Sequence, residues 1–175
     1  MPDRDTPRAA AILVDGPADV DALLAEVTQA CQAEGVRLRG LLMHREQVGQ
    51  GCATEMIMVD VHTRARYPVS QPLGQGATGC RADPDGFARA GRVLHEARAE
   101  AAELVICNRF GSLEAEGGGF AEELLALMAD GIPVLTAVSP RHQDAWARFT
   151  GGAPVLPAEP EAVQRWLKKI RPARS

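Results

Sequence analysis

Two segments of this sequence combine an arginine with glycines and small polar residues, which is a composition suited to holding an anion. They are residues 70–81 and residues 108–119. Backbone N–H groups of a glycine-rich loop can converge on one anion, and a guanidinium offers a planar fork of donors to an oxyanion. We therefore expect a small oxyanion or a phosphate group to bind here. The candidate ligand-binding residues are Ser70, Gln71, Gly74, Gly76, Thr78, Gly79, Cys80, Arg81, Asn108, Arg109, Gly111, Glu114, Gly117, Gly118 and Gly119.

Structural roles compete with binding in both segments. Arg109 is equally suited to an ion pair with Glu114 or Glu116 that only holds the loop in place. Cys80 has no histidine near it in the sequence, which favours an inert thiol over a nucleophile. Residues 117–119 precede a helix whose N-terminus attracts anions, but acidic side chains of the chain can satisfy that end instead. The acidic residues concerned are Glu116, Glu122 and Glu123.

A third segment has the layout of a phosphate-binding loop but lacks the cation that such a loop uses. Residues 9–14 form an apolar run typical of a buried strand, and residues 20–31 repeat apolar side chains at helical spacing. Between them, a loop that binds nucleotide phosphates needs a lysine for the outer phosphates and a Ser or Thr for magnesium. This chain has Asp15, Gly16 and Asp19 there. Asp15 and Gly16 join the candidate ligand-binding residues, and no catalytic residue or metal ligand is assigned.

Charge and composition exclude several classes of function. The net charge is −4 and aromatic residues make up only 4 % of the chain, so we expect no nucleic-acid partner, which needs basic patches and stacking platforms. No apolar run reaches the roughly 18 residues of a membrane helix, so we expect no membrane partner. The polar residues 1–8 indicate a disordered tail rather than a secretory signal. A cytoplasmic location is the expectation that follows.

The cysteines point to a reduced protein without a metal site. Their spacing matches no zinc template, and reduced thiols fit a cytoplasmic location. Cys31 and Cys107 lie within apolar patterns and are expected in the core. The four cysteines are Cys31, Cys52, Cys80 and Cys107.

Strands and helices alternate along the chain, which favours an α/β fold. The helix-linked strands are apolar throughout, as in a mostly parallel sheet with helices on both faces, and an antiparallel hairpin is attached at residues 55–70. Ligands bind beyond the carboxyl ends of such strands, where residues 15–19, residues 108–119 and the loop after Val138 are expected to meet. One domain is expected over residues 9–175, with strands at 9–14, 36–43, 55–61, 66–70, 104–107 and 132–138, helices at 20–31, 84–102, 120–130, 141–149 and 159–170, and residues 71–81 irregular.

The order of these features resembles the small family of P-loop nucleoside triphosphatases first described from thermophilic bacteria. It is still more similar to an uncharacterised bacterial branch related to that family, over about residues 10–157. The branch shares the loop that ends in Gly79-Cys80-Arg81 and the segment that begins Asn108-Arg109-Phe110-Gly111. The resemblance implies a three-layer, P-loop-NTPase-like fold.

The family motif is matched only in part. The family ends one strand with Asp-Glu-Ile-Gly-x-Met-Glu, and this chain reads Asn108-Arg109-Phe110-Gly111-Ser112-Leu113-Glu114. The aspartate that helps to hold magnesium falls on Asn108, and the acidic residue beside it falls on Arg109. The resemblance therefore implies a site that disfavours a metal and favours a free oxyanion. Members of the branch are often encoded near molybdenum-handling genes, which implies molybdate or tungstate as a ligand.

Three functions remain open on the sequence. The leading one is a protein that binds a small oxyanion or a nucleotide without magnesium-dependent turnover. The second is a nucleoside triphosphatase or phosphotransferase with an unorthodox site, in which Asp15, Asp19 or Glu114 holds the metal. The third is a regulatory protein that keeps only the scaffold and acts through a homodimer or a partner complex, with Phe110 and Leu113 as candidate contact residues.

Overall fold

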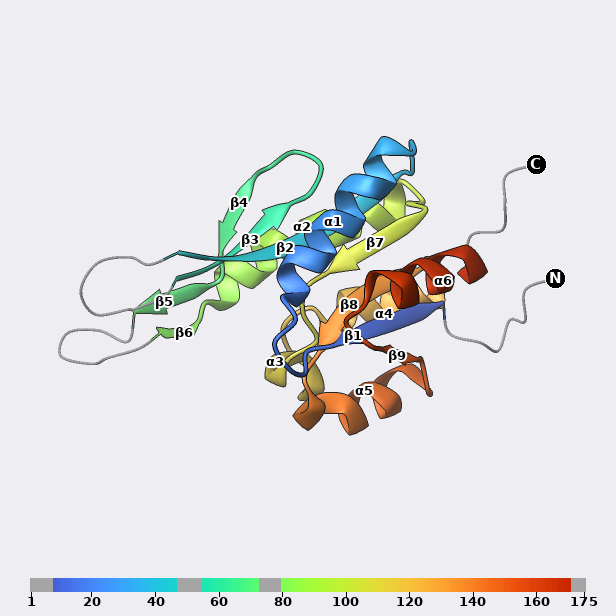
Figure 1. Cartoon of the computed structure of the whole chain (residues 1–175). Helices are drawn as coiled ribbons and strands as arrows, with labels where there is room; N and C mark the ends of the chain where they lie inside the picture. Colours follow the sequence, from blue (N-terminus) through green and yellow to red (C-terminus); the bar gives the residue numbers. More distant parts are fainter. Residues whose placement is uncertain (1–7, 47–54, 73–79, 171–175) are drawn as a thin grey trace.

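A seven-stranded sheet forms the centre of the molecule (Figure 1). The structure is a computed structural model that describes residues 8–46, 55–72 and 80–170. The strand order is β4-β3-β2-β7-β8-β1-β9, in which β3 and β4 are antiparallel to their neighbours and the other pairs are parallel. The strands are β1 (Ala9–Leu13), β2 (Leu38–Glu46), β3 (Glu55–Asp60), β4 (Arg66–Pro68), β7 (Leu104–Cys107), β8 (Val134–Val138) and β9 (Val155–Leu156).

Helices cover both faces of this sheet. Successive side chains of a strand point to opposite faces, so Ala10 and Ile12 of β1 pack in one cluster with α1 (Val20–Ala33) and α6 (Pro160–Ile170). Ala9 and Ala11 pack in a second cluster, with the helices of the other face. The three layers confirm the predicted α/β architecture. The remaining helices are α2 (Pro84–Ala99), α3 (Ser112–Ala115), α4 (Ala121–Ala129), the 3-10 helix η1 (Pro140–His142) and α5 (Gln143–Thr150).

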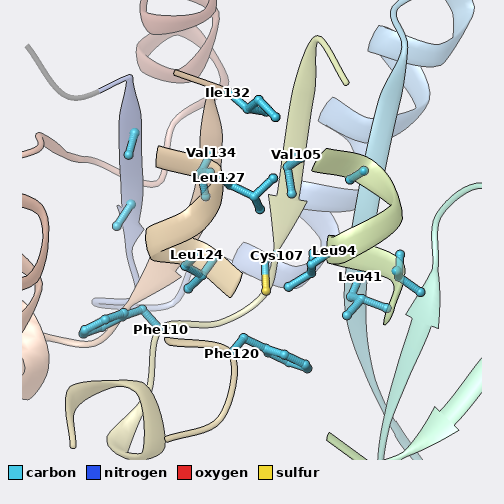
Figure 2. Close-up of a cluster of buried hydrophobic side chains, with 14 of the residues drawn as sticks. Leu41, Leu94, Val105, Cys107, Phe110, Phe120, Leu124, Leu127, Ile132 and Val134 are labelled. Atoms are coloured by element: carbon cyan, nitrogen blue, oxygen red, sulfur yellow. The ribbon is translucent and has the colours of Figure 1, made fainter. Parts of the chain in front are cut away.

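The second cluster continues past the carboxyl end of β7 (Figure 2). Cys107 ends the strand, and Phe110 and Phe120 lie just beyond it, both fully or almost fully buried. The ring centroids of Phe110 and Trp146 are 5.3 Å apart in an edge-on arrangement, and aromatic pairs of this kind add to the stabilisation from burial. The chain that follows β7 is therefore anchored in the core on both sides of its polar residues.

Helix α1 begins where the sequence predicts. Oδ1 of Asp19 accepts the N–H of Ala22 at 3.0 Å, which makes Asp19 the N-cap. Gly35, with φ of +78°, follows the end of the helix. The cap fixes the first turn of α1 directly after the loop that leaves β1, and this turn carries Asp21.

Several details differ from the sequence-based expectations. β2 continues to Glu46, past the expected end at residue 43, and Ser112–Ala115 form a helix that was not expected. Residues 71–81 were expected to be irregular, but a strand lies at each end of this segment, and the two strands pair as a separate antiparallel sheet. The strand expected at residues 66–70 is interrupted at Val69, and its two parts belong to different sheets. The short strand β9 extends the sheet edge beyond β1. Arg8, expected in a disordered tail, accepts the N–H of Val134 at 2.9 Å through its carbonyl. The two additional strands are β5 (Ser70–Pro72) and β6 (Cys80–Ala82).

Among residues 8–46, 55–72 and 80–170, no helix has both the length and the apolar character needed to cross a membrane.

Candidate functional site

The carboxyl ends of β1, β7 and β8 bring three loops together, as predicted. The N–H of Val14, just after β1, donates to the carbonyl of Val138 at 2.8 Å. The N–H of Phe110, after β7, donates to the carbonyl of Ala137 at 2.9 Å. The end of β8 thus touches the residues that follow β1 and β7. Beyond β8, Nε2 of His142 lies 3.2 Å from Oγ of Ser112, which follows β7.

Asn108 and Arg109, the first residues after β7, meet the carboxylate of Asp21 in the first turn of α1. Nδ2 of Asn108 donates to Oδ1 of Asp21 at 2.7 Å, and Nη2 of Arg109 lies 3.6 Å from the same oxygen. Asn108 is fully buried, whereas the side chains of Arg109 and Asp21 are 25 % and 42 % exposed. The ion pair that the sequence suggested for Arg109 with Glu114 or Glu116 is therefore formed with Asp21.

Two buried polar atoms of this cluster are unpaired among the described residues. Within the described part of the chain, Oδ1 of Asn108 and Nε of Arg109 are buried and have no hydrogen-bond partner. Buried polar atoms are rarely left unpaired, because each one costs about 1–3 kcal/mol. An acceptor and a donor on neighbouring residues suit a ligand that carries both kinds of group, such as a phosphate with a hydroxyl nearby.

Glu114 packs against the glycine segment that was expected to admit an anion. A Cβ atom at Gly119 would lie 2.7 Å from Oε2 of Glu114, and the φ of +56° at this position favours glycine. Burial raises the pKa of Glu114 to about 7, against hydrogen bonds from the backbone at Glu114 and Gly111 that lower it. Glu114 is therefore the acidic side chain that packs on Gly119. Glu122 and Glu123 lie in the first turn of α4, the helix end at which the sequence suggested them.

The two cysteines expected in the core are there. Cys31 and Cys107 are both buried and form no disulfide. Burial, followed by the charges of Glu114 and Glu123, raises the pKa of the Cys107 thiol well above its ordinary value. Because the thiolate is the nucleophile, Cys107 is unsuited to catalysis. Cys52 lies outside the described residues.

The first glycine-rich segment starts and ends in the β5–β6 hairpin. Gln71 pairs with Arg81 across this hairpin, and Arg81 is exposed. Ser70 is buried, and its Oγ accepts the N–H of Met56 at 2.8 Å, so the Ser70 hydroxyl serves the fold. Cys80 begins the returning strand. The remaining candidates of this segment lie outside the described residues: Gly74, Gly76, Thr78 and Gly79.

Residues 9–166 match the model of a family described as protein of unknown function (DUF2478). The chain belongs to the DUF2478 family. It is also 37 % identical over 165 residues to the molybdenum import ATP-binding protein ModC 2 of Bradyrhizobium diazoefficiens. That match covers 94 % of this chain but 18 % of the relative, so the chain spans less than a fifth of the relative's length.

The fold of this DUF2478 chain is also found in a solved structure. The solution structure of a human cancer-related nucleoside triphosphatase matches it with a TM-score of 0.65 at 16 % sequence identity. The match covers 95 % of this chain and 97 % of the other. It confirms the P-loop-NTPase-like fold that the resemblance implied.

In this DUF2478 chain, the loop after β1 offers carboxylates rather than a cation. Asp15 and Gly16 are exposed, and Asp19 is occupied as the cap of α1. Among the residues that the structure describes, no three His, Cys, Asp or Glu side chains lie close enough together to hold a metal ion. Among these described residues, Asp15, Asp19 and Glu114 therefore do not belong to any three-residue cluster of the kind that the suggested metal site would need.

Two residues near the site were not predicted from the sequence, and two others were expected to be contact residues for a partner. Asp21 was missed, although an acidic residue in the first turn of the helix after a strand is a usable signal. Ser112 was also missed, and its Oγ lies 3.2 Å from Nε2 of His142. Phe110, a candidate contact residue for a partner, is fully buried, and Leu113 is half-buried.

Proposed function

We propose that this protein binds a tetrahedral oxyanion, free or as the phosphate of a nucleotide, where β1 and β7 end. The observation that carries the proposal is the guanidinium of Arg109, which Asp21 holds at 3.6 Å and whose Nε has no partner among the described residues. A guanidinium that is already oriented loses little further freedom when it binds an oxyanion. Ligands of open α/β sheets also bind at this edge.

The charges around Arg109 set the affinity that we expect. Asp21 competes with any anion for the guanidinium, so we expect dissociation constants between about 10 µM and 1 mM. We propose that the exposed Arg81 of the β5–β6 hairpin supplies a second guanidinium. Backbone N–H groups would come from the glycine-bearing segments, namely Gln71, Gly74, Gly76, Thr78 and Gly79 on one side and Gly111, Gly117 and Gly118 on the other.

Molybdate and tungstate are the second class of ligand that we propose. The observation that favours them is the 37 % identity to a relative named as a molybdenum import ATP-binding protein. Both are tetrahedral dianions, and the donors that suit them are those that suit phosphate. A role in molybdenum handling would follow if they displace phosphate.

Calorimetric titration of the purified protein tests this proposal. The ligands are inorganic phosphate, ATP, molybdate, tungstate and sulfate. Arg109→Ala should weaken binding at least about tenfold, because a hydrogen bond to a charged group contributes about 1.5–3 kcal/mol. Arg92→Ala, which changes an exposed arginine on α2, is the matched control and should bind as the wild type does. The absence of heat with every ligand at millimolar concentration would end the proposal.

Hydrolysis is tested in the same series. With ATP and Mg²⁺, we expect no phosphate release above that of a heat-denatured sample. Glu114 is the group to change if release is seen, because a carboxyl with a pKa of about 7 can take up a proton near neutral pH. Magnesium-dependent release that disappears in Glu114→Gln would replace the binding proposal with a hydrolase.

A further inference from the structure

A groove of about 340 Å³ runs along α1, on the side of the sheet extension formed by β2 and β3. Helix α2 packs against β2, β3 and β4 on one face, whereas α1 packs against β2 on the other. Figure 1 shows α1 crossing β2, with β3 and β4 beyond it. The groove lies in the angle between α1 and these strands, and its volume is at the lower end of the roughly 300–1,000 Å³ of small-molecule sites.

The groove begins at the candidate oxyanion site. Asp21 lines it, and Oδ1 of Asp21 is the atom that Asn108 and Arg109 approach. From Asp21 the lining continues along one face of α1 to Gln32. At a rise of about 1.5 Å per residue, this face is about 16 Å long. A ligand that is held at Arg109 by one end can therefore place its other end in the groove.

The walls of the groove are apolar and its edges are polar. Leu42 of β2 and Val59 of β3 are direct neighbours across the two strands, and both line the groove opposite Ala25 of α1. Gln29 and Gln32 add amide groups along the helix, and Nε2 of Gln32 donates to the carbonyl of Val61 at 2.9 Å. His44, Arg64 and Arg66 also line the groove and add an imidazole and two guanidinium groups. Apolar walls with amides and these nitrogen-bearing groups at the edge suit a flat ring that carries both donors and acceptors.

We propose that this groove binds the nucleoside part of a nucleotide whose phosphate lies at Arg109. The inference rests on the proposed function and narrows it to a nucleotide. The base lies between α1 and the Leu42–Val59 wall, with its polar edge toward Gln29 and Gln32. The ribose lies at Asp21, because a carboxylate is a good acceptor for ribose hydroxyls. Asn108 and Arg109 both approach Oδ1 of Asp21. Oδ2 has no such partner among the described residues, so it is left for a ribose hydroxyl.

Calorimetry with matched ligands and variants tests the groove separately from the oxyanion site. The probes are AMP, GMP, CMP and UMP, the corresponding nucleosides, and inorganic phosphate. Ala25→Phe and Val59→Phe each fill the groove from opposite walls. Ala30→Phe places the same ring on an exposed position of α1 outside it and is the control. Circular dichroism confirms that each variant is folded before it is titrated.

We expect at least one monophosphate to bind about tenfold or more tightly than inorganic phosphate. Ala25→Phe and Val59→Phe should reduce its affinity to that of phosphate and leave phosphate binding unchanged, and Ala30→Phe should change neither. If no monophosphate exceeds phosphate, or if both folded groove variants keep the full difference, the groove is not the nucleoside site. If nucleosides bind the wild type but not Ala25→Phe, while Arg109→Ala leaves every affinity unchanged, the groove is a nucleoside site and Arg109 is not the oxyanion site.

Discussion

Asp21 in the first turn of α1 and Asn108 directly after β7 are 87 positions apart in the sequence and are joined by a hydrogen bond of 2.7 Å. The bond ties the helix that follows β1 to β7, which lies two strands away in the sheet. Asn108 is fully buried, so its amide has no water to turn to if the carboxylate is removed. The same carboxylate faces Arg109, and one residue therefore positions both groups of the candidate site.

Asp21→Ala should lower the free energy of unfolding by about 1–3 kcal/mol, which is the usual cost of leaving a buried donor unsatisfied. Urea denaturation followed by circular dichroism measures this. Glu26→Ala removes an exposed carboxylate from the same helix and should change the free energy by less than about 0.5 kcal/mol. Equal losses in the two variants would mean that the bond to Asn108 does not stabilise the fold.

Asp21→Asn should behave differently, because asparagine can still accept a hydrogen bond from Asn108 but has no charge. The positive charge of Arg109 is then no longer compensated by a carboxylate, and we expect inorganic phosphate to bind this variant a few times more tightly than it binds the wild type. An exposed ion pair contributes roughly up to 1 kcal/mol, which corresponds to about fivefold in affinity. Calorimetric titration measures the change. Weaker binding in this variant would show that the carboxylate acts by orienting Arg109 rather than by competing for it.

The raised pKa of Glu114 should make the free energy of unfolding depend on pH. Its pKa is about 7 in the folded protein, against an ordinary glutamate pKa of 4.5, so the folded state binds more protons than the unfolded state between these two pH values. Stability from this group is fully present below about pH 4.5 and is lost as the pH rises through 7, by about 3 kcal/mol in all. Urea denaturation of the wild type at several pH values measures the slope.

Glu114→Gln isolates this contribution because glutamine stays neutral. The variant should gain stability relative to the wild type as the pH rises from about 5 to about 8. Glu116→Gln, at an exposed position in the same segment, should follow the wild-type curve. A constant difference between Glu114→Gln and the wild type over this range would contradict a raised pKa.

Much of the fold follows from local signals in the sequence. The apolar runs at residues 9–14 and 104–107 are buried strands because they have no polar face to turn to water. Asp19 and Asp83 cap α1 and α2 because short polar side chains satisfy the free N–H groups of a first turn. The position of Asn108 and Arg109 followed from the rule that a residue ending a parallel strand lies at the ligand-binding edge.

The parts that could not be predicted depend on contacts between distant segments. Glutamate is usually exposed, and only the packing of Gly119 against Glu114 reveals that this one is buried. The partner of Arg109 was sought nearby in the sequence, whereas α1 brings Asp21 to it across the sheet. Strand β9 has two residues, which is too short for any periodic pattern to indicate it.

Gly40, the third residue of β2, is where the sheet should be most sensitive to a single methyl group. Its φ is +141°, and a Cβ atom there would lie 1.8 Å from the carbonyl oxygen of Ile106 on β7. Gly40→Ala should therefore separate β2 from β7 and cost about 3 kcal/mol or more, seen as a loss of soluble protein or a lower urea midpoint. At Gly118 the nearest contact of a Cβ would be 3.4 Å, from Leu113, so Gly118→Ala should fold normally. A stable Gly40→Ala would mean that the backbone there can move without penalty.

Phe110 links the stability of the core to the placement of Arg109, its neighbour in the chain. The ring is fully buried, with centroids 5.3 Å from that of Trp146 and 5.1 Å from that of Phe149. Phe110→Ala should lower the free energy of unfolding by about 3–5 kcal/mol, whereas Leu125→Ala, at a side chain that is 47 % exposed, should change it little. Phe110→Leu keeps most of the apolar volume, so it should stay folded yet hold Arg109 less firmly and bind phosphate more weakly. Urea denaturation and phosphate titration measure the two effects, and a Phe110→Leu variant that is destabilised but binds phosphate as tightly as the wild type would show that the aromatic anchor does not position the site.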